Sequence, residues 1–104
     1  MDKYDTITYQ QAIGVIDAGA VLIDVREDDE YSAGTIPGAV NIPLSEFTQS
    51  KQKIEQYTDI LLFCRSGRRS EKAAKVLCNW TEKKFFCLDG GYKAYLEYIN
   101  NQGK

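Results

Sequence analysis

The sequence has 104 residues, of which 43% are hydrophobic and 27% are charged, and its formal net charge is −2. This length predicts one domain over residues 1–104, and the composition is typical of a globular protein rather than a disordered one. The slight negative charge provides no general attraction for nucleic acids or anionic membranes, so we expect neither as a partner.

Short apolar runs predict the strands of a sheet. Residues 21–25 and 60–64 are almost continuously apolar, as in parallel strands that are covered on both faces. Further strands are expected at residues 39–42 and 85–88.

Helical segments are expected between these strands. Thr8 is a candidate N-cap for a helix over residues 9–18, and Gly19 would end it. Another helix could start at Ser45 and carry Phe47. The remaining helical signals are an amphipathic turn with Ile54 and Tyr57, a helix over 70–80 with an apolar stripe of Ala73, Ala74, Val76, Leu77 and Trp80, and a last helix after Gly91 that would bury Tyr92, Tyr95, Leu96 and Ile99.

Strands that alternate with helices indicate an α/β fold with a mainly parallel sheet. In such sheets, ligands bind beyond the carboxyl ends of the strands. Three predicted strands end at chemically distinctive residues, which are Asp24 and Arg26, Cys64 and Arg65, and the segment 89–91 (Asp-Gly-Gly). We therefore expect the site at this edge of the sheet.

The cysteine pattern argues against disulfides and metal sites. The three cysteines leave one unpaired, no pair of them has metal-ligand spacing, and the chain has no histidine. We expect no metal, no cofactor and a reducing, cytoplasmic location. The N-terminus lacks the apolar segment of a signal peptide, and no stretch is long enough to span a membrane.

The segment 63–70, FCRSGRRS, has the composition of an anion-binding loop. Backbone N–H groups of a glycine-containing loop between a strand and a helix can point at one spot, and the helix N-terminus adds positive potential. The thiolate of Cys64 would be stabilised there, which suits a nucleophile that meets an anionic substrate. A cysteine that ends a strand is often only a small apolar side chain. The many donors after Cys64 favour the nucleophile, whereas Cys78 and Cys87 lack such surroundings and are expected in the core.

Asp24 lies within a predicted buried strand, where a carboxylate is costly unless it is paired. Its partner could be Arg26 or an arginine of the loop. A supporting role for Asp24 and Arg26 is favoured over acid–base chemistry.

Several motifs, taken together, resemble the rhodanese family over residues 7–98. The resemblance rests on VLIDVRE at 21–27, EY at 30–31, GTIPGA at 34–39, NIPL at 41–44, CRSGRRS at 64–70 and LDGGY at 88–92. It implies a single-domain rhodanese-like α/β fold with a central, mainly parallel five-stranded sheet flanked by helices on both faces.

The resemblance also implies sulfur transfer. Cys64 would take sulfur from a small anionic donor such as thiosulfate and pass it, as a persulfide, to a small thiophilic acceptor such as cyanide or to a thiol protein. The backbone of Arg65, Ser66, Gly67, Arg68 and Arg69 would cradle the persulfide, and the three arginines would attract the donor. The family often has histidine where Thr35 stands, a position that we interpret as part of a turn.

Three other functions remain open. Rhodanese-like phosphatases and arsenate reductases have an arginine six residues after the cysteine, where this chain has Ser70. The shorter loop favours a sulfur-sized ligand over a tetrahedral oxyanion. A regulatory binding module is disfavoured because Cys64 is present, and a sulfur relay to a partner protein would use the same chemistry.

Overall fold

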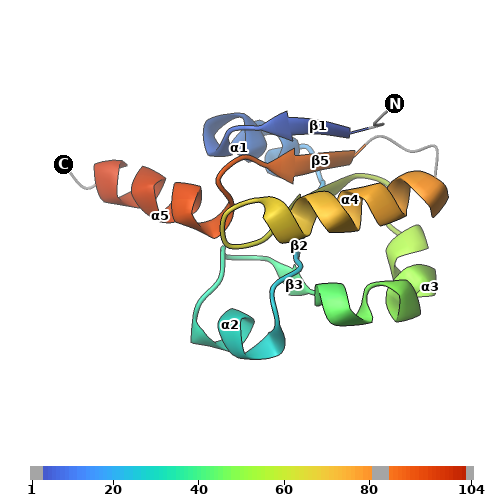
Figure 1. The fold of residues 1–104 in the computed structure, drawn as a ribbon. Helices are drawn as coiled ribbons and strands as arrows, with labels where there is room; N and C mark the ends of the chain where they lie inside the picture. The colour runs from blue at the N-terminus through green and yellow to red at the C-terminus, as the bar shows by residue number, and fades with distance from the viewer. Residues whose placement is uncertain (1–3, 81–84, 103–104) are drawn as a thin grey trace.

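The computed structural model describes residues 4–80 and 85–102 and contains one five-stranded sheet (Figure 1). The strand order is β1-β5-β4-β2-β3, and every neighbouring pair is parallel. The fold is therefore α/β, as predicted. The strands are β1 (Tyr4–Ile7), β2 (Val21–Asp24), β3 (Val40–Asn41), β4 (Ile60–Phe63) and β5 (Phe85–Leu88), and the helices are α1 (Tyr9–Asp17), α2 (Asp28–Ala33), α3 (Lys51–Glu55), α4 (Arg68–Trp80) and α5 (Gly91–Gln102).

The central strand β4 divides the core into two halves. Its four residues are all buried, and successive side chains point to opposite faces of the sheet. Ile60 and Leu62 belong to a cluster that includes residues of α3 and α4. Leu61 and Phe63 belong to a second cluster that includes residues of α1 and α5. Helices therefore cover both faces of the sheet, which explains why β4 reads as a continuous apolar run.

Two elements were not predicted, because their sequences are polar. The edge strand β1 has the sequence YDTI, and Asp5 and Thr6 in its middle are exposed. The helix α2 has the sequence DDEYSA and no buried residue. Each element is short and lacks the apolar pattern from which an element is predicted.

Two further predictions need correction. The segment after Ser45 forms two short 3-10 turns, Leu44–Glu46 and Thr48–Ser50, rather than an α-helix. In α5, Tyr92 and Tyr95 pack against the second cluster, but Leu96 and Ile99 are exposed. Figure 1 shows that α5 extends away from the strands beyond the carboxyl edge of the sheet, and in its later turns Tyr98 packs against Tyr9 of α1 while Leu96 and Ile99 remain exposed.

The start of α1 agrees with its prediction. The Thr8 hydroxyl accepts a hydrogen bond from the Gln11 N–H at 3.2 Å, and the Gln11 side chain accepts one from the Thr8 N–H at 3.0 Å. This reciprocal pair satisfies two N–H groups that have no partner within the helix. No described helix is long and apolar enough to cross a membrane.

Candidate active site

The carboxyl ends of three strands meet where the sequence predicted the site. Strand β4 lies between β2 and β5, so the chain leaves the sheet at Asp24, Phe63 and Leu88 along one edge. The loop that follows Phe63 is short, because α4 begins at Arg68, two residues earlier than predicted.

The sulfur of Cys64 lies inside this loop. The Gly67 N–H donates a hydrogen bond to Cys64 Sγ at 3.0 Å, and Cys64 is only 1% exposed. The N-terminus of α4 follows directly and adds positive potential near the sulfur. Gly67 has φ = 119°, a backbone conformation that favours glycine. A backbone donor therefore already points at the sulfur.

Ser70 also contacts the sulfur, although sequence reasoning treated it only as the position of a missing arginine. Its side chain is buried, and its Oγ lies 3.7 Å from Cys64 Sγ. The same hydroxyl donates to the Gly67 carbonyl at 2.9 Å. A hydroxyl can rotate, so it can accept from a thiol or donate to a thiolate. The only sequence signal for this role was a small polar residue in an otherwise apolar helix face.

The N-terminus of α5 holds the start of the loop. The Tyr92 N–H donates to the Cys64 carbonyl at 2.8 Å, and the Lys93 N–H donates to the Arg65 carbonyl at 3.2 Å. Gly91 makes this approach possible, since a Cβ there would overlap the Cys64 carbonyl oxygen and lie 2.9 Å from that of Arg65. The Asp-Gly-Gly turn therefore positions the loop as well as starting the helix.

Asp24 pairs with Arg26 rather than with an arginine of the loop. The Arg26 guanidinium contacts both carboxylate oxygens of Asp24, at 2.8–3.1 Å, and both side chains are buried. The Thr35 hydroxyl donates to the same carboxylate at 2.9 Å. Thr35 is therefore more than a turn residue, since it completes the hydrogen bonding of a buried charge.

Arg26 also connects this ion pair to α5. Its guanidinium donates to the Gly34 carbonyl at 2.6 Å, and its Cζ lies 4.4 Å from the centre of the Tyr92 ring. This is the geometry of a cation–π interaction. The end of β2, the segment around Gly34 and the helix that holds the loop are thus joined through one side chain.

The loop arginines differ in their surroundings, which revises the expectation that all three attract a donor. Arg69 makes a two-pronged ion pair with Glu30 of α2, at 2.6 and 3.0 Å. The hydrogen bond from Arg69 lowers the pKa of Glu30 to about 2. Arg65 and Arg68 are exposed, as is Ser66 between them. The guanidinium of Arg69 is therefore engaged in holding α2, and Arg65 and Arg68 carry the positive charge at the loop surface.

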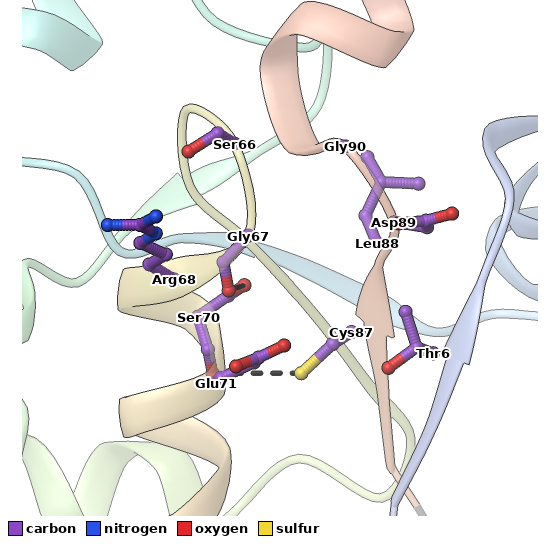
Figure 2. Close-up of a pocket in the computed structure, with 10 residues that line it drawn as sticks. All are labelled: Thr6, Ser66, Gly67, Arg68, Ser70, Glu71, Cys87, Leu88, Asp89 and Gly90. Atoms are coloured by element: carbon purple, nitrogen blue, oxygen red, sulfur yellow. Dashed lines mark hydrogen bonds between the residues drawn. The ribbon is translucent and has the colours of Figure 1, made fainter.

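A cavity of about 100 Å³ borders the loop on the side of β5. In Figure 2, the loop and the first turn of α4 form one wall, and the end of β5 forms the other. Its lining residues are Thr6, Ser66, Gly67, Arg68, Ser70, Glu71, Cys87, Leu88, Asp89 and Gly90.

Neither of the other two cysteines has the surroundings of Cys64. Cys87 lines the cavity and donates to the Ser70 carbonyl at 3.6 Å, and burial raises its pKa to about 12. Cys87 therefore stays protonated near neutral pH. Cys78 is partly buried against the first core cluster. Within residues 4–80 and 85–102, no three Cys, Asp or Glu side chains are grouped so that they could hold a metal ion.

Comparisons with known proteins place these features in a family. A family model described as the rhodanese-like domain matches residues 8–98. The chain is 41% identical over 76 residues to the uncharacterized protein YqhL of Bacillus subtilis, covering 73% of this chain and 60% of YqhL. It is 27% identical to the thiosulfate sulfurtransferase GlpE of Tolumonas auensis, over 91% of each chain.

A solved structure agrees with these matches. The human single-domain sulfurtransferase TSTD1 superposes with a TM-score of 0.77 at 29% identity, covering 88% of this chain and 95% of that one. Some curated relatives are much longer, and the chain spans only 26% of the tRNA uridine(34) hydroxylase of Acinetobacter baumannii.

The contact at Gly91 generates a first prediction. Gly91→Ala should lower the free energy of unfolding by several kcal/mol, because the new methyl group meets the Cys64 carbonyl and also requires a positive φ of 54°. Gly19→Ala is the matched control, since Gly19 has φ = 109° and no atom within 4 Å of an added Cβ. It should cost about 1–2 kcal/mol. If Gly91→Ala and Gly19→Ala lowered the free energy of unfolding in urea by the same amount, α5 would not constrain the loop.

The ion pair between Glu30 and Arg69 generates a second prediction. The folded-state pKa of Glu30 lies below its ordinary value of 4.5, so the pair stabilises the fold fully above about pH 4.5 and progressively less as the pH falls towards 2. Glu30→Gln should cost about 1 kcal/mol at neutral pH, because both side chains are partly exposed. The difference from the parent protein should shrink at about pH 3. A constant difference between the two pH values would exclude the ion pair as its cause.

Proposed function

The chain belongs to the rhodanese-like domain family, and we propose that it is a sulfurtransferase whose carrier is a persulfide on Cys64. The observation that carries the proposal is the hydrogen bond of 3.0 Å from the Gly67 N–H to Cys64 Sγ, in a loop that leads into the N-terminus of α4. The proposed donor is a small sulfur-containing anion such as thiosulfate. The acceptor is cyanide or a thiol.

In the first step, the Cys64 thiolate attacks the outer sulfur of thiosulfate. A bond forms between Cys64 Sγ and that sulfur, and the sulfur–sulfur bond of thiosulfate breaks with its electron pair going to sulfite. The exposed guanidinium groups of Arg65 and Arg68 attract the dianion and stabilise the departing sulfite. No histidine base is needed when the cysteine reacts as a preformed thiolate.

In the second step, the acceptor removes the outer sulfur. The nucleophile attacks this atom, the bond to Cys64 Sγ breaks, and Cys64 leaves as a thiolate. Until then, the Gly67 N–H holds the inner sulfur of the persulfide, and the Ser70 hydroxyl would have to turn from the Gly67 carbonyl to donate to the same sulfur. Low exposure of Cys64 protects the intermediate from solvent.

The remaining residues of the predicted site support the loop in this proposal. Asp24 and Arg26 fix the end of β2 and the Tyr92 ring, and Arg69 fixes α2 through Glu30. In the described part of the chain, none of Asp24, Arg26 and Arg69 forms a hydrogen bond with Cys64 Sγ. We therefore assign Cys64 the chemistry, Arg65 and Arg68 the capture of the donor, and the three others a positioning role.

The loop favours sulfur transfer over phosphate chemistry. A phosphatase of this fold would have an arginine at position 70. This chain has a buried serine there, so the loop lacks that guanidinium. The names of GlpE and TSTD1, both sulfurtransferases of similar size, support the same choice. A purely regulatory module would not require a donor aimed at a cysteine sulfur. The free state of all three cysteines fits a reducing, cytoplasmic location.

Intact mass spectrometry tests the persulfide directly. Thiosulfate should make the protein heavier by one sulfur atom, and cyanide should then remove that atom and release thiocyanate. Cys64→Ser should stay folded and lose both events, whereas Cys87→Ser, the matched control, should retain them because Cys87 stays protonated. A protein that gains no sulfur but hydrolyses an aryl phosphate through Cys64 would be a phosphatase instead.

Two arginine variants separate donor capture from positioning. Arg65→Ala should raise the KM for thiosulfate about tenfold with little change in stability, because its side chain is exposed. Arg69→Ala should instead lower the free energy of unfolding by about 1 kcal/mol, since it breaks the pair with Glu30. Steady-state kinetics and urea unfolding on the same samples provide both readouts. Identical effects of the two substitutions on KM would refute this division of roles.

A further inference from the structure

Exposed basic side chains border the active-site loop. We call this set the basic rim, and its members are Arg65 in the loop, Arg68, Lys72 and Lys75 on α4, and Lys93 on the first turn of α5. None of them forms an ion pair with a residue in the described ranges 4–80 and 85–102. Their charges are therefore available to a partner.

We propose that the basic rim is a docking surface for an acidic protein that presents the acceptor thiol to Cys64. The inference rests on the sulfur transfer proposed above and names the class of acceptor. Small acceptors such as cyanide would then be surrogates for this protein thiol.

The extent of the rim exceeds what a small substrate can contact. Arg68, Lys72 and Lys75 are spaced by four and three residues, so they lie on one face of α4. At 1.5 Å per residue, Lys75 lies about 10 Å along the helix axis from Arg68. An anion of the size of thiosulfate bound near the sulfur would not reach Lys75. The outer charges of the rim therefore fit a larger partner.

The rim also joins two helices into one surface. Lys93 lies beside the loop, because its N–H donates to the Arg65 carbonyl at 3.2 Å. Glu30 is paired with Arg69, and the other acidic residues nearby, which are Glu71 on α4, Asp89 before α5 and Glu97 on α5, are fewer than the five basic residues of the rim. A positive surface on a chain of net charge −2 would orient an acidic partner with this face towards it.

Nucleic acid fits the rim less well than an acidic protein. Domains that bind nucleic acids usually carry a net positive charge, and those that bind single strands stack bases on aromatic side chains. Here the net charge is −2, and the Tyr92 ring beside the loop is already covered by the Arg26 guanidinium.

The burial of Cys64 determines how the partner must present its thiol. Because Cys64 is 1% exposed, only a narrow group, such as a cysteine on a chain end or a projecting loop, would reach the persulfide. The acceptor thiol first loses its proton to solvent. Its thiolate then bonds to the outer sulfur, the bond between that sulfur and Cys64 Sγ breaks, and Cys64 is released as a thiolate while the acceptor becomes the persulfide.

Peptide acceptors test the inference. The full chain is loaded with thiosulfate, the gain of sulfur is verified by mass, and transfer is timed to two single-cysteine peptides of equal length, one rich in Asp and Glu and one rich in Asn and Gln. The rate constant for each peptide is divided by the rate constant for cyanide. The intrinsic reactivity of each peptide thiol is measured separately with a neutral disulfide, and the ratio is corrected for it. The acidic peptide should react about tenfold faster at low salt, and the advantage should fade at about 0.2 M salt.

Charge reversals on the outer rim localise the effect. Lys72→Glu and Lys75→Glu should each reduce the rate ratio of acidic peptide to cyanide about threefold. Lys53→Glu is the matched control, since Lys53 is an exposed lysine on α3 outside the rim, and it should leave the ratio unchanged.

Three outcomes would overturn the inference. Equal rates for the two peptides would exclude a charge-selective surface, and an equal effect of Lys53→Glu would exclude the rim as its location. Stronger inhibition by an RNA oligonucleotide than by a cysteine-free acidic peptide would assign the rim to nucleic acid. Failure to gain sulfur from thiosulfate is a separate result, because it would refute the proposed function and the docking inference with it.

Discussion

Two backbone hydrogen bonds from α5 determine the shape of the active-site loop. The N–H groups of Tyr92 and Lys93, at the start of that helix, donate to the carbonyl groups of Cys64 and Arg65, just after β4 ends. Because these N–H groups have no partner within their own helix, the contact satisfies both sides at once. It also requires Gly91, since any side chain there would collide with the loop. With its first residues held, the loop can turn at Gly67 and direct that N–H back to the sulfur.

Ion pairs on the other side of the loop complete this arrangement without touching the sulfur. Arg26 is held by Asp24 and packs on the ring of Tyr92, so it connects the end of β2 to the start of α5. Arg69 ties the start of α4 to Glu30 in α2. The charged side chains in these two ion pairs thus hold neighbouring segments in place. The charged side chains that remain exposed around the loop are available to substrates and partners. This division explains how an acidic chain can present a basic face at its site.

The parts of the structure that depend on apolar pattern could be predicted from the sequence, and the parts that depend on contacts between distant residues could not. The run at 60–64 predicted β4 because both of its faces are buried, whereas β1 is a polar edge strand and was missed. Cys64 and Gly67 were identified from the local composition of one loop. The role of Ser70 and the pairing of Arg69 with Glu30 depend on where a helix starts and on which segments meet in space, and no pattern in the sequence indicates that.

The central claim is that the loop is built to hold a negatively charged sulfur on Cys64 through the Gly67 N–H. Amide proton and nitrogen chemical shifts of the full chain, recorded while thiosulfate is added, test it most directly. A persulfide anion should strengthen this hydrogen bond and move the Gly67 amide proton downfield, while the amide of Gly19, which lies at the end of α1, should not move. A Gly67 resonance that stays in place while the mass of the protein increases by one sulfur atom would contradict the account.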